Sequence, residues 1–148
     1  HGATLTVVGL TISLHIAGMF GLSPVFGLLA DRWGRVATVL LGYGILAACV
    51  AVIALAQHDT TAVTVALVLL GLGWSAATVA GSTLLTEASA EALRTRRQGR
   101  TDFWMSLAGA LGAVGAGGAL SWAGFSGLAL LALPILIAVA ALSPLARR

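Results

Sequence analysis

The sequence predicts an all-α integral membrane protein with five transmembrane helices. Of its 148 residues, 59% are apolar and only 9% are charged, and the mean hydropathy is +1.02. A soluble domain carries about a quarter charged residues, so this chain could not cover a globule with polar surface. Five uncharged stretches reach the length of about 20 residues that a helix needs to cross a bilayer. They are continuously apolar rather than alternating, which disfavours a β-barrel.

Each predicted span must be helical, because lipid offers no hydrogen-bond partner to backbone N–H and C=O groups. Short connections separate the spans, whose approximate ranges are 4–30, 36–57, 62–86, 103–122 and 125–146. Ser23 and Pro24 interrupt the first span, and Pro134 interrupts the fifth. Proline removes a backbone donor, so we expect a kink at each position.

The arginines predict the orientation of the chain. Lysine is absent, and all eight cationic residues lie at alternate connections or at the C-terminus: Arg32, Arg35, Arg94, Arg96, Arg97, Arg100, Arg147 and Arg148. The positive-inside rule makes that side cytoplasmic. We therefore expect a multi-pass protein of the cell membrane, with its N-terminus outside and its C-terminus in the cytoplasm. Arginine without lysine also suits a bacterial gene of high GC content.

The connection between the first two spans carries the most specific motif: Gly27, Asp31, Arg32, Gly34 and Arg35 form G-x-x-x-D-R-x-G-R. Gly27 lets two helix ends approach closely and Gly34 permits a tight turn. Asp31 can hold Arg35 or the positive end of a neighbouring helix. The motif resembles the signature loop of the major facilitator superfamily (MFS), which implies a partial MFS helical bundle.

In that family the loop follows helix 2 and recurs after helix 8. The N-terminal half usually carries an arginine a few residues before a G-x-G, whereas Gly71-Leu-Gly73 follows four apolar residues. We therefore interpret the five spans as helices 8 to 12 of a transporter whose N-terminal helices are missing. The resemblance implies secondary transport of a small-molecule solute by alternating access, with proton-coupled efflux as one common form, and we expect this piece to be inactive alone.

Three residues within or beside the spans are candidates for mechanism. His15 is the one ionisable side chain deep in a span, and it is either a substrate or proton site or a neutral histidine bonded to a neighbouring helix. Trp74 lies mid-span, where its indole faces a cavity or packs between helices. Asp102 either shares a helix start capped by Thr101 or makes a gating contact with cytoplasmic arginines.

The fourth span is rich in small residues. Gly109, Gly112 and Gly115 lie among alanines with small-xxx-small spacing. Such residues let helix backbones pack closely, so we expect a tight helix interface there, or a helix that bends during gating.

Other functions fit the residues less well. A half-size subunit that acts as a dimer, or a membrane scaffold, would share the same spans. An intramembrane serine hydrolase would use the G-x-S-G string at 124–127, but both candidate histidines, His15 and His58, precede Ser126. Without lysine there is no Walker A loop. We therefore expect no enzyme activity, no cofactor and no metal, and the partners are lipid and the missing helices rather than nucleic acid.

Overall fold

The computed structural model describes the backbone of residues 4–142, together with the side chains of residues 4–122 and of a few positions beyond. The described part is helical, without a strand. Its elements are α1 (Leu5–Phe20), α2 (Ser23–Trp33), α3 (Arg35–Ala56), α4 (Thr60–Glu87), the 3-10 turn η1 (Glu91–Leu93) and α5 (Arg94–Leu142). The all-α class expected from the sequence is thus confirmed.

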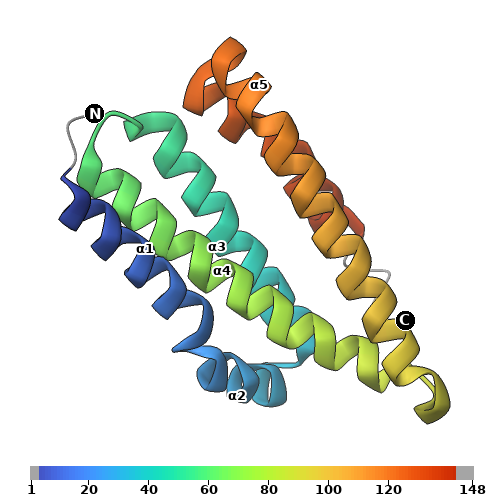
Figure 1. Cartoon of the computed structure of the whole chain (residues 1–148). Coiled ribbons are helices and arrows are strands. Elements are labelled where there is room, and N and C mark those ends of the chain that lie inside the picture. Colours follow the sequence, from blue (N-terminus) through green and yellow to red (C-terminus); the bar gives the residue numbers. More distant parts are fainter. Residues whose placement is uncertain (1–3, 143–148) are drawn as a thin grey trace.

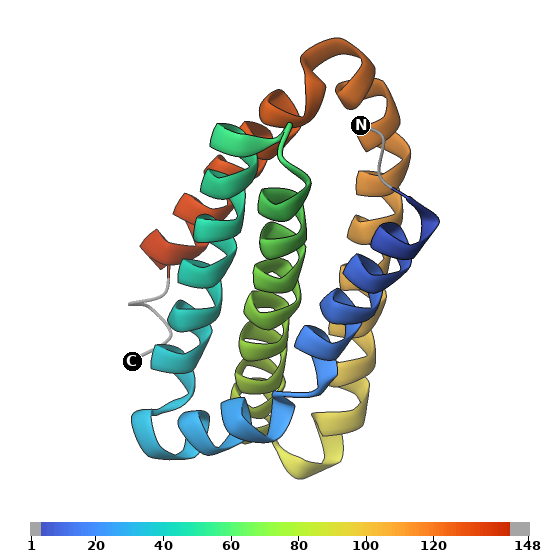
Figure 2. The same cartoon turned by 90° about the vertical axis from the view of Figure 1, so that its left-hand side faces the viewer.

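Helix α4 is the central element of the bundle. It contacts α1, α2, α3 and α5, and Figure 2 shows it between α3 on one side and α1 on the other. Helix α2 lies across the end of the bundle at which α3 begins (Figures 1 and 2). The residues that join α1 to α4 are offset by a constant 52 or 53 positions, as for Thr11 with Thr64 and His15 with Leu67. A constant offset means that the two helices run parallel.

The first predicted span is broken rather than kinked. Helix α1 ends at Phe20, Gly21 caps it, and α2 starts at Ser23 with Pro24 in its first turn. The ring of a proline clashes with the carbonyl four residues earlier, which here belongs to Phe20, but proline is tolerated in the first turn of a new helix. The two helices together make one stretch, Leu5–Trp33, that is long and apolar enough to cross a membrane.

Helices α3 and α4 cover the second and third predicted spans, and both are long and apolar enough to cross a membrane. Gly34 separates α2 from α3 and has φ +95°, a conformation that glycine adopts without strain. Asp59 caps α4 by accepting hydrogen bonds from the N–H groups of Thr61 and Ala62, at 2.7 and 3.1 Å. The turn between α3 and α4 is therefore stabilised by a side-chain cap from within the turn itself.

The fourth and fifth predicted spans differ from the structure. Helix α5 begins at Arg94, ahead of the predicted residue 103, and its backbone stays helical through the predicted turn at 122–125. The ribbon turns back on itself in the orange-red part of α5 (Figures 1 and 2).

Four helical stretches, rather than the expected five, are long and apolar enough to span a membrane among the described residues; the fourth is Glu91–Trp122. Pro134 lies inside α5, and the kink expected there stays a prediction.

Small residues bring α3 and α4 together. A Cβ atom on Gly42 would lie 2.7 Å from the backbone nitrogen of Ala77 and 2.8 Å from the carbonyl oxygen of Gly73. Ala76 and Ala80 of α4 are fully buried. Such contacts are the close backbone packing that small residues permit in membrane helices.

Candidate functional site

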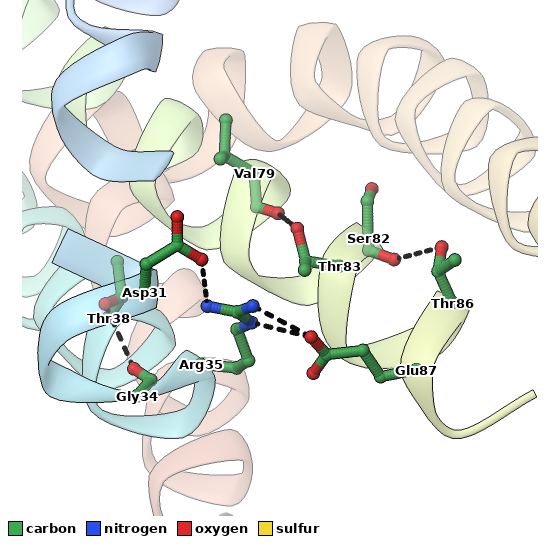
Figure 3. A network of polar contacts seen from close by, with 9 residues as sticks. All are labelled: Asp31, Gly34, Arg35, Thr38, Val79, Ser82, Thr83, Thr86 and Glu87. Carbon is green, nitrogen blue, oxygen red and sulfur yellow. Dashed lines mark hydrogen bonds and ion pairs between the residues drawn. The ribbon is translucent and has the colours of Figure 1, made fainter. Parts of the chain in front are cut away.

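A charged cluster lies where α2, α3 and the end of α4 meet, and Figure 3 shows it. The Arg35 guanidinium donates to Asp31 Oδ1 at 2.5 Å through Nη1, and to Glu87 Oε1 at 2.8 Å through Nη2 and 3.2 Å through Nε. The expected pairing of Asp31 with Arg35 is present. The third member, Glu87, was not expected from the sequence, because it stands 52 residues away from Arg35.

The local backbone creates this cluster. Gly34 turns the chain so that Arg35 opens α3 while Asp31 stays in the last turns of α2. The Arg35 side chain is 22% exposed, against 66% for Asp31 and 53% for Glu87. Ion pairs at such exposure are weakened by water and dissolved ions, so each contributes little to stability and the cluster can form and break readily.

The other motif residues take structural positions. Arg32 lies in the last turn of α2, where a cation is favoured by the helix dipole. Gly27 has no described neighbour within 4 Å of the position of a Cβ atom. The close helix approach expected at Gly27 is therefore not seen among the described residues.

His15 is half-buried between α1 and α4. Its Nδ1 lies 2.7 Å from the carbonyl oxygen of Leu67, which can only accept, so Nδ1 carries the hydrogen and Nε2 is left as an acceptor in the neutral ring. Gly71 provides the space, because a Cβ there would lie 3.3 Å from Nδ1. This geometry matches the simpler of the two expectations, a histidine bonded to a neighbouring helix.

The face of α1 that carries His15 packs on α4. Thr11 is buried, and its hydroxyl lies 3.0 Å from that of Thr64. Gly18 lies against the backbone of α4, because a Cβ atom added to it would be 3.2 Å from the carbonyl oxygen of Val68. A role of His15 in binding substrate or protons stays a prediction, one that would use Nε2, for which no hydrogen bond to a described residue is present.

Trp74 and Asp102 line the same groove, of about 440 Å³, between α3, α4 and α5. Its other lining residues are Tyr43, Leu46, Ala77, Thr78, Gly81, Ser82, Leu85, Gln98, Thr101 and Met105. Trp74 also makes an edge-to-face contact with Phe20, at 6.0 Å between ring centres. The groove has the volume of a small-molecule site, which runs to about 300–1,000 Å³, and its mixture of aromatic and polar side chains.

Gln98 organises the polar end of this groove. Its Nε2 donates to Asp102 Oδ1 at 3.0 Å and to Ser82 Oγ at 3.4 Å. Its buried Oε1 has no hydrogen-bond partner among the described residues. Asp102 is thus bonded to an amide, and none of the described ion pairs includes it.

The expected helix cap at Thr101 is wrong. Helix α5 already begins at Arg94, so Thr101 is inside it and its hydroxyl donates to the carbonyl oxygen of Arg97 at 3.1 Å. Asp102 therefore does not stand in the first turn of a helix.

The glycines of the fourth predicted span have no described neighbour. A Cβ atom added to Gly109, Gly112 or Gly115 would meet nothing within 4 Å. Within the described part of the chain, no group of three His, Cys, Asp or Glu side chains could hold a metal ion.

Known proteins resemble this chain along its length. The sequence profile of the Major Facilitator Superfamily matches residues 1–148. The chain is 40% identical over 111 residues to the uncharacterized MFS-type transporter YddS and 37% identical over 116 residues to the uncharacterized MFS-type transporter YdeG, both of Bacillus subtilis strain 168. It is 33% identical over 105 residues to the riboflavin transporter RfnT of Brucella anthropi.

The matches cover most of this chain but only a small part of each relative. They cover 74%, 74% and 71% of this chain but 26% of each relative. The chain thus spans about a quarter of the length of the curated relatives that it matches. No solved structure gives a significant match.

Proposed function

Because this chain belongs to the major facilitator superfamily, we propose that it is the C-terminal part, helices 8 to 12, of a secondary transporter that moves a small solute across the cell membrane by alternating access. Its partners are lipid, the solute and the remaining helices of the transporter. Membership of this family points to a transporter rather than an enzyme.

The proposed topology has five crossings. Helices α1 with α2, α3 and α4 make the first three, and α5 makes the last two because its ribbon turns back (Figure 2). The N-terminus is then outside and the C-terminus cytoplasmic, as the positive-inside rule demands. The Arg35 cluster and the arginines of 94–100 lie at the cytoplasmic surface in this arrangement.

The cluster of Asp31, Arg35 and Glu87 is the observation that carries the proposal. It joins the cytoplasmic ends of α2, α3 and α4 through one guanidinium. Alternating access needs contacts at one membrane face that hold one arrangement and yield in the other. A half-exposed cluster of modest energy meets that requirement, since a small change in solute binding can shift the balance.

The groove of Trp74 and Asp102 is the proposed solute path within this part of the transporter. It runs from Trp74, 13 residues before the end of α4, to Leu85 near that end. In proton-coupled efflux, Asp102 and His15 are the groups that we propose to exchange protons. The riboflavin transporter among the relatives makes riboflavin the first solute to test.

The test is transport by the protein that carries this chain, purified and reconstituted in vesicles. We expect saturable movement of riboflavin or another small solute that stops when the ion gradient is collapsed. Glu87→Gln should slow it several-fold, because one half of the cluster is lost. Glu91→Gln is the matched control, since Glu91 lies in η1 and makes none of the described ion pairs.

A second measurement checks the gate itself. In a Cys49→Ala background, Leu84→Cys places a thiol in the hollow that Arg35 lines. Glu87→Gln should raise its rate of labelling from the cytoplasmic side, and Glu91→Gln should not. Equal labelling in both variants would argue against a gate at this cluster, and transport insensitive to every ion gradient would argue against secondary transport.

A further inference from the structure

A second groove, of about 550 Å³, lies at the start of α5 beside the end of α4. It is lined by Arg97, Arg100, Thr101, Trp104, Met105 and Leu85. The first four lie at i, i+3, i+4 and i+7, the spacing of one helix face. All of the lining residues on α5 are exposed. This groove is separate from the charged cluster, whose residues do not line it.

The groove is positively charged, and no described acidic side chain neutralises its two arginines. No carboxylate lines it, and both described ion pairs belong to Arg35. Arg97 is held in place, because its Nη1 donates to the carbonyl oxygen of Ala88 at 3.3 Å and to Ser89 Oγ at 3.2 Å. These bonds use one nitrogen of the guanidinium, which has five N–H donors. Arg100 makes no described hydrogen bond or ion pair.

The chemistry changes in order along the helix. From Arg97 to Trp104 is seven residues, about 10 Å of helix. Arg97 and Arg100 lie toward the start of α5, and Trp104, which is 61% exposed, lies further along the same face. Met105 and Leu85 form an apolar wall beside Trp104. A phospholipid presents the same order, with a phosphate, a glycerol region where indole rings settle, and acyl chains.

We propose that this groove binds an anionic phospholipid of the cytoplasmic leaflet. The phosphate lies between the guanidinium groups of Arg97 and Arg100, and the first part of an acyl chain runs along Trp104 and Met105. Charge-assisted bonds from arginine to phosphate are strong and directional. The site rests on the cytoplasmic placement of the arginines, but not on which solute the protein carries.

A free phosphate ion has the same headgroup chemistry but does not need the apolar wall. The two sources can therefore be told apart through Trp104, which a lipid contacts and a free ion in water does not.

The experiment places the protein that carries this chain in nanodiscs of equal phosphatidylglycerol and phosphatidylcholine, and counts retained lipids by native mass spectrometry. The unchanged protein should retain phosphatidylglycerol preferentially. Arg100→Gln should reduce this preference about five-fold, the effect of one arginine near an anionic surface. Arg100 is exposed and makes no described hydrogen bond or ion pair, so the variant should fold normally.

Arg96→Gln is the control. It removes the same charge from the same run, but Arg96 does not line the groove. Trp104→Ala should weaken retention of phosphatidylglycerol, while competition by inorganic phosphate alone should have little effect.

Three outcomes would overturn the proposal: equal loss in Arg96→Gln and Arg100→Gln, no preference in the unchanged protein, or displacement by inorganic phosphate with no effect of Trp104→Ala. The transport assay is separate, so failure here leaves the proposed function standing.

Discussion

The interface between α3 and α4 and the first arm of α5 (residues 94–122) are both rich in small residues, but they behave differently. Between α3 and α4, Gly42 and Gly73 bring two backbones so close that a Cβ on either would lie within 3 Å of the other helix. Along α5, Gly109 and Gly112 meet no described neighbour. In an 18-residue apolar segment of Thr60–Glu87, 28% of the residues are buried. In the corresponding segment of Glu91–Trp122, no residue is buried.

Small residues therefore permit close packing without enforcing it. In lipid there is no hydrophobic drive between helices, so association depends on matched surfaces and on hydrogen bonds. The α1 and α4 pair has both, with the hydroxyls of Thr11 and Thr64 and the imidazole of His15 crossing between them. The described hydrogen bonds of the first arm of α5 to α4 and to the turn after it come from Arg94, Arg97 and Gln98, at the start of the arm.

The largest expected effect is at the packed interface. Gly42→Val should destabilise the fold by about 3 kcal/mol, because an overfilled contact must push two backbones apart. The contact is with the backbone of Ala77 and Gly73, which cannot swing away as a side chain can. Thermal unfolding in detergent would measure the loss, and a melting temperature equal to that of the unchanged protein would contradict the close packing.

A smaller loss is expected at the charged cluster. Arg35→Gln removes both ion pairs and should lower the melting temperature slightly in low salt. Because exposed pairs are screened by ions, the difference from the unchanged protein should shrink as salt is added. Arg96→Gln provides the comparison, since Arg96 makes no described ion pair. A loss in Arg35→Gln that does not depend on salt would point to packing instead.

The hydrogen bond between Thr11 of α1 and Thr64 of α4 should contribute less to the stability of the fold. The Thr64 hydroxyl donates to the carbonyl oxygen of Thr60, so Thr11 is the donor between the two threonines. Thr11→Val should cost about 0.6 kcal/mol, the average for such bonds in membrane proteins. Thr83→Val is matched, because the Thr83 hydroxyl bonds within its own helix, to Val79. Equal melting temperatures for the two variants would count against the contact.

The smallest effect is expected on α5. Gly112→Val should change stability by less than about 0.5 kcal/mol, as is usual for substitutions at exposed positions. The same substitution at Gly42 is its direct counterpart. If Gly112→Val unfolds the protein as Gly42→Val does, then the glycine face of α5 is packed after all, and the expectation of a tight interface there is restored.

Much of the fold follows from local sequence. Helices α3 and α4 match two predicted spans within two residues at each end, since a long apolar run flanked by polar residues can only be a helix in lipid. Asp31 and Arg35 are four residues apart, and their contact could be predicted because opposite charges on either side of a tight glycine turn lie within reach of each other.

Prediction from local sequence failed where one residue type is compatible with two different local structures. The first span contains Pro24, and the same residue can kink a helix or start a new one. Thr101 resembles a helix cap, but the arginine-rich segment before it is already helical, because arginine is a good helix former.

The sequence by itself determined the all-helical membrane class, the places of α3 and α4 and the connections at which the arginines gather. These properties depend on hydropathy and charge, which each segment carries alone. Only the tertiary structure decided that Arg35 meets Glu87 and that His15 bonds Leu67. It also decided that Gly42, unlike Gly112, meets a neighbouring helix among the described residues. These contacts join residues 52 positions apart or depend on which helix faces which, and a single sequence contains no local signal for the choice of neighbour.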